Sequence, residues 1–211
     1  MLACALIPIW FKAMAIGTKP GQLTSDRATA YYSMAIAVIT IVVALLGPMC
    51  GAISDYKGMK KIFFTSTVAV GVCGCILNGF ACQWIVFLLL FEVTKIFYNM
   101  SLMFYDSMLN DITTEERMDE VSSYGYAWGY LGSCIPFLIA LVAYVLGPDM
   151  AGIISGKLSM AIGFAVTGLW WLLVTVPLIK NYKQINYVEK KEHAVRSAFR
   201  RIFETIRFIA T

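Results

Sequence analysis

The sequence predicts an all-α, polytopic membrane protein built as a bundle of six spanning helices. Of its 211 residues, 59% are hydrophobic and only 14% are charged, whereas a soluble domain carries about 25% charged residues. Apolar runs of spanning length also follow one another along the chain, joined by short polar connections. Lipid offers backbone amides no hydrogen-bond partner, so each run is expected to be a helix. The lipid bilayer is therefore the first predicted partner.

The predicted domains are the six-span bundle, residues 1–180, and a polar segment, residues 181–211. The first span is short and starts at Met1 without a basic flank or a cleavage site. It is therefore not expected to be a signal peptide, and a shortened or fragmentary N-terminus is the expected explanation. The predicted spans are 1–17, 28–53, 62–81, 84–105, 122–146 and 159–179.

Basic residues predict the orientation, because they favour the cytoplasmic side of a membrane. The loop 54–61 holds three lysines, and most other basic residues follow Ile179, whereas the opposite side holds only Lys19, Arg27 and Lys157. Both ends are thus expected in the cytoplasm, with the bundle in the cell membrane. Apolar residues recur at three- and four-residue steps over 194–209, between arginines, which predicts a basic amphipathic helix. It is either a linker or a general membrane-surface anchor.

Several classes of function find no support in the sequence. The six cysteines mostly lie in apolar runs and form no CxxC pair, so neither a metal site nor a disulfide framework is expected. The single histidine, His193, lies in the tail, which disfavours an intramembrane enzyme. No phosphate loop is present, so ATP is not the expected driver. No cofactor is expected, and the net charge of +4 is too small to favour nucleic acid.

The loop after the second span carries the pattern Gly51-x-x-Ser54-Asp55-x-x-Gly58-x-Lys60-Lys61. Gly51 would let another helix approach closely, and Gly58 permits a tight turn with positive φ. Asp55 could cap a helix N-terminus or pair with a cation. Lys60 and Lys61 would hold the turn at an anionic membrane face. An ordinary basic loop would explain the lysines, but not Asp55 or the glycines, so a cytoplasmic gate is favoured.

This pattern resembles the signature loop of the major facilitator superfamily, in which it latches the cytoplasmic side of two halves. Residues 104–137 add Tyr105-Asp106-Ser107, Leu109-x-Asp111-Ile112, Arg117 and Val121-Ser122-x-x-Gly125 followed by Gly129-Tyr130-x-Gly132. They resemble the branch related to autophagy-linked vacuolar amino-acid effluxers. The resemblance covers nearly the whole chain but only the N-terminal half of such a transporter. It implies that Asp55 is a latch residue, and that a C-terminal six-helix half or a second copy completes the protein.

An internal echo fits an inverted repeat of two three-helix units, a known transporter plan. Leu46-Gly47-Pro48 is expected at the end of the second span, and Leu146-Gly147-Pro148 at the end of the fifth. Coincidence is the alternative, because the match is short.

Polar residues inside the fourth predicted span mark a candidate substrate or ion pathway. Glu92, Lys95 and Asn99 share one face of a helix, and Tyr98 lies beside them. Charges in a membrane are costly, so they should face the protein interior or a water-filled cavity. Structural pairing of Glu92 with Lys95 and a role in transport remain equally open. One cation, one anion and an amide could together bind a zwitterion such as an amino acid.

Two further features complete the predicted sites. Asp106, at the cytoplasmic end of the fourth span, is expected to form a gate-side ion pair with Lys60, Lys61 or Arg117 rather than to contact substrate. Gly125, Gly129 and Ser133 recur every four residues, which favours a seam where a neighbouring helix packs closely.

These observations predict a secondary transporter that moves a small solute, with an amino acid as the best candidate and a proton as a candidate coupling ion. Alternating access is the expected mechanism. The alternatives are a self-standing six-span protein that dimerises, or a channel.

Overall fold

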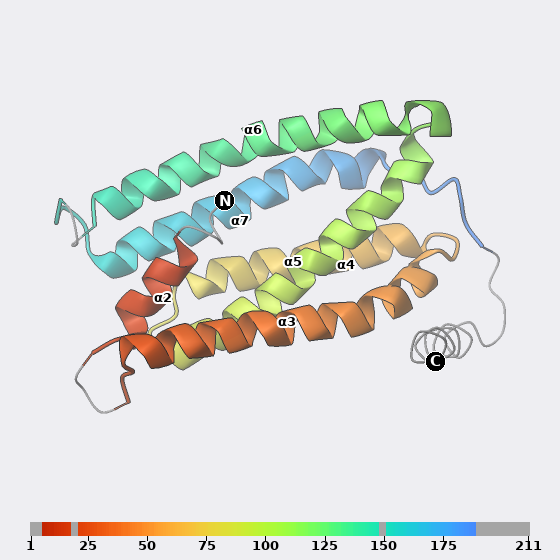
Figure 1. Ribbon diagram of the computed structural model, residues 1–211. Helices are drawn as coiled ribbons and strands as arrows, with labels where there is room; N and C mark the ends of the chain where they lie inside the picture. Colours follow the sequence, from red (N-terminus) through yellow and green to blue (C-terminus); the bar gives the residue numbers. More distant parts are fainter. Residues whose placement is uncertain (1–5, 18–20, 148–150, 189–211) are drawn as a thin grey trace.

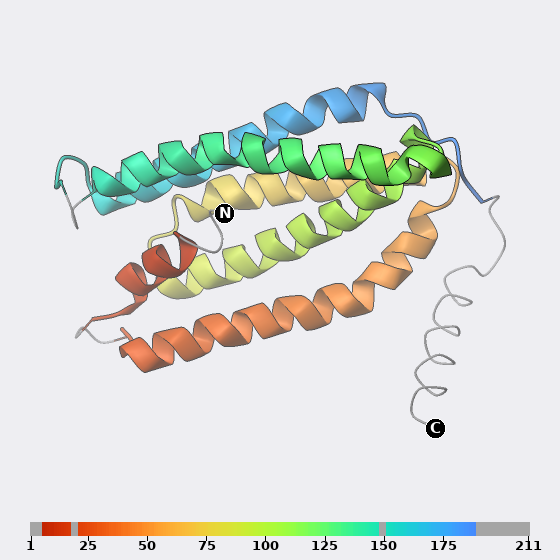
Figure 2. The same ribbon diagram turned by 45° about the horizontal axis from the view of Figure 1, so that its top comes forward.

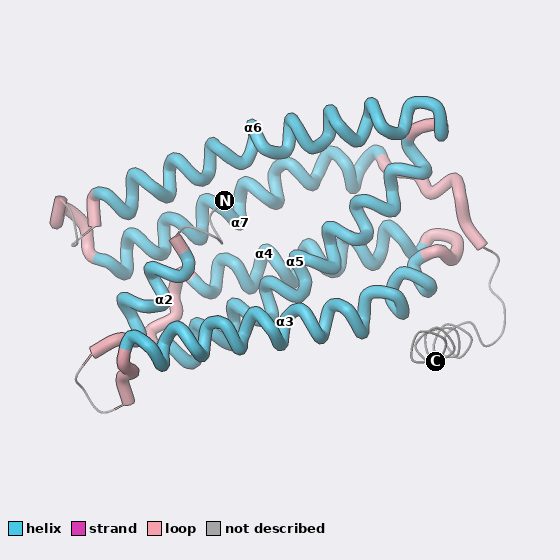
Figure 3. The backbone as a smooth tube through the Cα atoms, in the orientation of Figure 1, coloured by secondary structure: helices cyan, strands magenta, loops and turns pink. Residues whose placement is uncertain are grey.

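The computed structural model describes residues 6–17, 21–147 and 151–188, and this part of the chain is helical (Figures 1 and 3). Its only β-type pairings are two isolated bridges, one between Ile16 and Leu23 and one between Tyr56 and Val188. The helices in chain order are α2 (Ile7–Ala15), α3 (Ser25–Ser54), α4 (Met59–Asn78), α5 (Trp84–Ile112), the short 3-10 turn η1 (Glu115–Arg117), α6 (Met118–Val145) and α7 (Gly156–Asn181).

The predicted fold class is confirmed. Five of the described helices, α3 to α7, are long and apolar enough to cross a membrane, and they correspond to the second to sixth predicted spans. At the first predicted span, α2 has 9 residues, fewer than the roughly 20 that a spanning helix needs. Residues 1–5 and the predicted tail helix over 194–209 lie outside the described residues.

The helix α5 continues past the predicted boundary at residue 105. Phe104, Met108 and Asp111 are buried along one side of its last turns, at the three- and four-residue spacing of a single helix face. Burial of Phe104 and Met108 extends the helix to Ile112, beyond the exposed Asp106. The extension places Asp111 in the last helical turn.

The bundle is arranged around α4. This helix packs against both α5 and α7, while α6 packs against α7 and α3 packs against α5. The short helix α2 contacts α3 and α5, at the end of the bundle where α3 begins (Figures 1 and 2). The long helices run back and forth along the length of the bundle, and the connections between them lie at its two ends (Figure 1).

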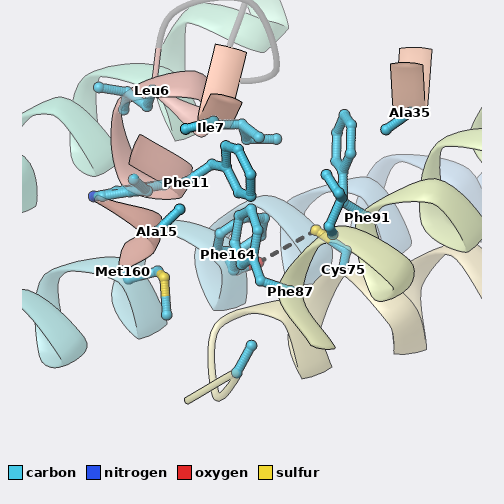
Figure 4. Packing of buried hydrophobic residues seen from close by; sticks show 14 of the residues in the cluster. Leu6, Ile7, Phe11, Ala15, Ala35, Cys75, Phe87, Phe91, Met160 and Phe164 are labelled. Atoms are coloured by element: carbon cyan, nitrogen blue, oxygen red, sulfur yellow. Dashed lines mark hydrogen bonds between the residues drawn. The ribbon is translucent and has the colours of Figure 1, made fainter. Parts of the chain in front are cut away.

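An aromatic cluster holds α2 to the longer helices (Figure 4). The ring centroids of Phe11 and Phe87 lie 6.2 Å apart, and those of Phe87 and Phe164 lie 5.8 Å apart. Trp10 meets Phe164 at 5.4 Å. Such ring pairs contribute about 0.5–1.5 kcal/mol each beyond the area they bury. This explains how so short a helix is fixed to the bundle.

Polar side chains also join α4 to α5. The Asn78 amide donates hydrogen bonds to the Gly74 carbonyl at 2.9 Å and to Thr94 Oγ1 at 3.2 Å. Thr94 Oγ1 in turn donates to the Leu90 carbonyl at 2.7 Å. Hydrogen bonds of this kind between helices are a usual source of association within membranes.

The outer faces of α3 and α6 are strongly apolar. Leu45 on α3 is 62% exposed and Trp128 on α6 is 71% exposed. Side chains of this kind require lipid or another protein surface around them, because water would make a continuous apolar face of this size costly.

Pro48 corrects one expectation from the internal echo. It was expected at the end of the second span, but it lies inside α3, which continues to Ser54. Figure 2 shows α3 bending in its last turns, and an internal proline is a common cause of such a bend because it removes one helical hydrogen bond. At the corresponding place in α6, the helix ends and Leu146 is its C-cap. Pro148 lies outside the described residues.

Candidate functional site

The α3–α4 connection, η1 and residues 182–188 all lie at one end of the bundle (Figure 1). We call it the basic end, because most of the described lysines and arginines gather there. Those residues are Lys57, Lys60, Lys61, Arg117, Lys180 and Lys183.

A buried ion pair joins α4 to α5 at the basic end. Gly58, with φ of 76°, caps the start of α4 in the left-handed conformation, as the sequence predicts. The turn brings Lys60 into the first turn of α4, where its ammonium lies 3.1 Å from Asp111 Oδ2. The two side chains are only 5% and 0% exposed. Lys60 also donates to the Ser107 carbonyl at 3.3 Å, so its charge is well satisfied.

Asp111 accepts hydrogen bonds from a third part of the chain. The Tyr182 hydroxyl, just past the end of α7, donates to Asp111 Oδ2. The backbone amides of Ile185 and Asn186 donate to Oδ1 at 3.2 and 2.7 Å. Burial of the Tyr182 phenol, its hydrogen bond to Asp111 and the nearby negative charges raise its pKa, so it remains a donor at physiological pH. We call Lys60, Asp111 and Tyr182 the clasp.

The segment that follows Tyr182 is tied to the α3–α4 connection. We call residues 182–188 the strap. The Val188 amide donates to the Asp55 carbonyl at 2.9 Å, and the Gly58 amide donates to Gln184 Oε1 at 2.9 Å. Lys57 lies over the Tyr187 ring, 5.3 Å from its centroid. The strap therefore connects α7 to the loop that the sequence predicts to be a gate.

The other predicted gate residues occupy different positions. The side chain of Asp55 is exposed at the C-cap of α3. Arg117 pairs with Glu120 at 3.3 Å, with both side chains largely exposed. At Gly51, no atom of the described chain comes within 4 Å of the position that a Cβ would take. Lys61 is half-buried.

The carboxylate that pairs with Lys60 differs from the one expected. Asp106 is exposed, and Lys60 pairs with Asp111, five residues further along α5. Asp106 and Asp111 lie on different sides of the helix, and only Asp111 follows the buried side of Phe104 and Met108. That spacing was the signal for Asp111 in the sequence. A role for Asp106 at the gate stays a prediction.

Within α5, the structure brings Lys95 and Tyr98 together. The Lys95 ammonium lies 4.6 Å from the centroid of the Tyr98 ring. Tyr98 in turn meets Trp171 of α7, with centroids 5.5 Å apart and ring planes 75° apart. Glu92 and Asn99 are half-buried on the same helix. The sequence did not single out Trp171, because a tryptophan in an apolar run carries no signal of its own.

The three small residues on α6 lie along its first half. The Tyr105 hydroxyl of α5 lies 3.6 Å from the position of a Cβ on Gly125. At Gly129, no atom of the described residues lies within 4 Å of such a position. Ser133 donates to the Tyr130 carbonyl of its own helix at 2.8 Å. The predicted seam is thus open toward the outside of the described bundle around Gly129.

Comparison with known proteins places these features in context. A family model described as "Vacuole effluxer Atg22 like" matches residues 21–211. The chain is also 34% identical, over 211 residues, to an uncharacterized MFS-type transporter, YxiO, of Bacillus subtilis (strain 168). The match covers 99% of this chain and 49% of the relative, so the chain spans about half the length of that curated protein. No solved structure matches the chain.

Proposed function

Because this chain belongs to the family of vacuole effluxer Atg22 like proteins, we propose that it forms part of a secondary transporter for amino acids. The observation that carries the proposal is the group of polar residues within the apolar helix α5. Lys95, half-buried over Tyr98, shares this helix with the half-buried Glu92 and Asn99. Charged side chains are costly in a membrane and commonly mark a substrate or ion pathway. An ammonium, a carboxylate and an amide match the two charges of a zwitterion.

Uptake by reconstituted protein tests this proposal. The protein, expressed from its complete reading frame, is placed in liposomes and supplied with a radiolabelled mixture of the protein amino acids. Saturable uptake is expected, with loss of uptake in Glu92→Gln and in Lys95→Met. The matched controls are Glu115→Gln and Lys157→Met, which remove exposed charges outside α5 and should leave uptake unchanged. Retained uptake in both Glu92→Gln and Lys95→Met would show that these polar residues have only a structural role. Flux that does not saturate would indicate a channel.

The proposed mechanism is alternating access, in which the gate opens and closes the cytoplasmic side of the transporter. The basic end then faces the cytoplasm. The buried clasp and the strap join α4, α5, α7 and the α3–α4 connection, so these parts can move as one body. The exposed side chains of Asp55 and Asp106 can then contact the other half of the complete transporter. Labelling with a membrane-impermeant maleimide in sealed cells tests the orientation, in a Lys61→Cys variant whose six native cysteines are changed to serine. No labelling until the cells are opened is expected, and labelling of intact cells would reverse the assignment.

The apolar outer faces of α3 and α6 are proposed to be covered by the other half of the complete transporter. The chain spans about half of its relative, and the surface around Gly129 is open within the described residues. Gly129→Leu should therefore impair uptake, whereas Leu131→Ala, on a neighbouring exposed position, should not. The molar mass of the purified protein in detergent distinguishes one copy of a two-half protein from a dimer of the present chain.

A further inference from the structure

The ammonium of Lys95 lies against the face of an aromatic ring. Lys95 Nζ lies 4.6 Å from the centroid of Tyr98, one turn further along α5. The electron-rich face of an aromatic ring attracts a cation by about 0.5–2 kcal/mol, more when water is excluded. A charge-assisted hydrogen bond to a carboxylate contributes an amount of similar size, about 1.5–3 kcal/mol. A substrate carboxylate can therefore compete with the ring for the Lys95 ammonium.

The orientation of the Tyr98 ring is set from another helix. Trp171 of α7 meets it edge to face, with centroids 5.5 Å apart and planes at 75°. This is one of the preferred arrangements of two aromatic rings, worth about 0.5–1.5 kcal/mol beyond the area buried. Since Tyr98 is partly exposed, the contact with Trp171 restricts a ring that would otherwise have more freedom.

Trp171 is itself fixed by close packing against α4. A Cβ on Gly71 would lie only 2.4 Å from Trp171 Cη2 and 2.8 Å from Cζ3. Only glycine leaves room for the indole at this position. Contacts therefore run from Gly71 on α4, through Trp171 on α7, to Tyr98 and Lys95 on α5.

We infer that Trp171 is a positioning residue that acts through Tyr98 to place Lys95 for binding a substrate carboxylate. The inference rests on the proposed function and deepens it, because it assigns the anionic group of the substrate to Lys95. Amines without a carboxylate would then not be substrates. Loss of the edge-to-face contact between Trp171 and Tyr98 should weaken substrate binding without abolishing the conformational changes of the transporter.

Kinetics of uptake in the reconstituted protein test this inference, with the amino acid that is taken up best as the probe. Trp171→Leu and Tyr98→Leu are expected to raise KM about three- to tenfold, in line with the loss of one ring contact, while the maximal rate changes little. Trp171→Phe and Tyr98→Phe keep a ring and should restore a KM near that of the unsubstituted protein. The matched control is Trp170→Leu at the adjacent tryptophan of α7, which is also half-buried; this change should leave KM unchanged. The unlabelled amino acid should compete for uptake, and its decarboxylated amine should not.

A second measurement separates failure of the inference from failure of the proposed function. Trp171 fluorescence is recorded in a variant in which the other four tryptophans are replaced by phenylalanine. Tyr98→Leu should change this emission, while a substitution of the exposed Leu102 by alanine should not. Absence of amino-acid uptake would overturn the proposed function. Three results would each overturn the inference itself. These are an unchanged KM in Trp171→Leu and Tyr98→Leu, an equal rise of KM in Trp170→Leu, and Trp171 fluorescence that does not change in Tyr98→Leu.

Discussion

The ammonium of Lys60 and the carboxylate of Asp111 lie 3.1 Å apart between α4 and α5, with almost no exposed surface on either side chain. Removing two charges from water is costly, and good geometry with further hydrogen bonds is needed to offset that cost. Asp111 meets the requirement, since it accepts hydrogen bonds from Tyr182 and from two backbone amides as well as from Lys60. The pair therefore fixes the relative position of helix ends rather than adding stability by charge alone.

Asp111→Asn should destabilise the protein strongly. The substitution keeps the size of the side chain but leaves the Lys60 ammonium buried without a counter-charge, a change that typically costs about 3–5 kcal/mol. Thermal unfolding of the purified protein in detergent measures the effect as a lower melting temperature. The control is Asp106→Asn on the same helix, where the carboxylate is exposed and the expected change is within about 0.5 kcal/mol. Equal effects of the two substitutions would contradict the assignment of Asp111.

Removing both charges of the clasp should lower the stability of the protein by less than the sum of the two single removals. Lys60→Met and Asp111→Leu each leave one buried charge alone, whereas the double variant leaves none. Groups in direct contact usually show interaction energies of about 0.5–3 kcal/mol in such a cycle. The melting temperatures of the unsubstituted protein, the two single variants and the double variant give the interaction energy. Strict additivity of the two single effects would mean that Lys60 and Asp111 do not interact.

Gly58 should tolerate asparagine better than valine. Its φ of 76° is in the left-handed region, which costs most residues about 1–2 kcal/mol, while asparagine adopts it more readily than β-branched residues do. Gly58→Val should therefore lower the melting temperature clearly, and Gly58→Asn only slightly. No described atom lies within 4 Å of a Cβ at this position, so a clash does not account for the difference. Equal loss in the two variants would point to a cause other than backbone strain.

A disulfide between positions 56 and 188 should form readily and leave transport intact. Tyr56 and Val188 are partners in an isolated parallel bridge, and bridged backbones lie close enough for disulfide geometry. The pair Tyr56→Cys and Val188→Cys is introduced after the six native cysteines are changed to serine, and oxidation is followed by a mobility shift.

Uptake after oxidation tests whether the strap and the α3–α4 connection move together. Full activity of the cross-linked protein is expected, because the proposed mechanism moves the strap and the α3–α4 connection as one body. Inhibition that a reducing agent reverses would show instead that the strap must leave the connection during transport.

The sequence predicted the helical bundle well, because long apolar runs in a membrane have few alternatives to the helix. It also predicted the left-handed turn at Gly58, because glycine adopts a positive φ at no steric cost. Lys60 was identified by the same pattern. The prediction of its partner was wrong, because the predicted span ended at residue 105, before Asp106, instead of following Phe104 and Met108 to Asp111.

Other parts of the clasp carry little signal in a single sequence. The Ile185 and Asn186 donors are backbone amides, and every residue except proline has one. Tyr182 and Gln184 stand in a polar stretch after the last span, where their pairing with residues more than 70 positions earlier depends on the way α7 returns to the basic end. Trp171 belongs to the same class, because its contacts with Gly71 and Tyr98 exist only once three helices are packed.

The strap determines where tension from the rest of the polypeptide would be felt. The chain continues beyond Val188, and the last hydrogen bond of the strap joins Val188 to Asp55 rather than to α7. A pull exerted on the residues that follow would therefore reach the turn after α3 first, and α7 only through Tyr182 and its hydrogen bond to Asp111. Mechanical load on this chain would therefore enter at the turn that contains Gly58.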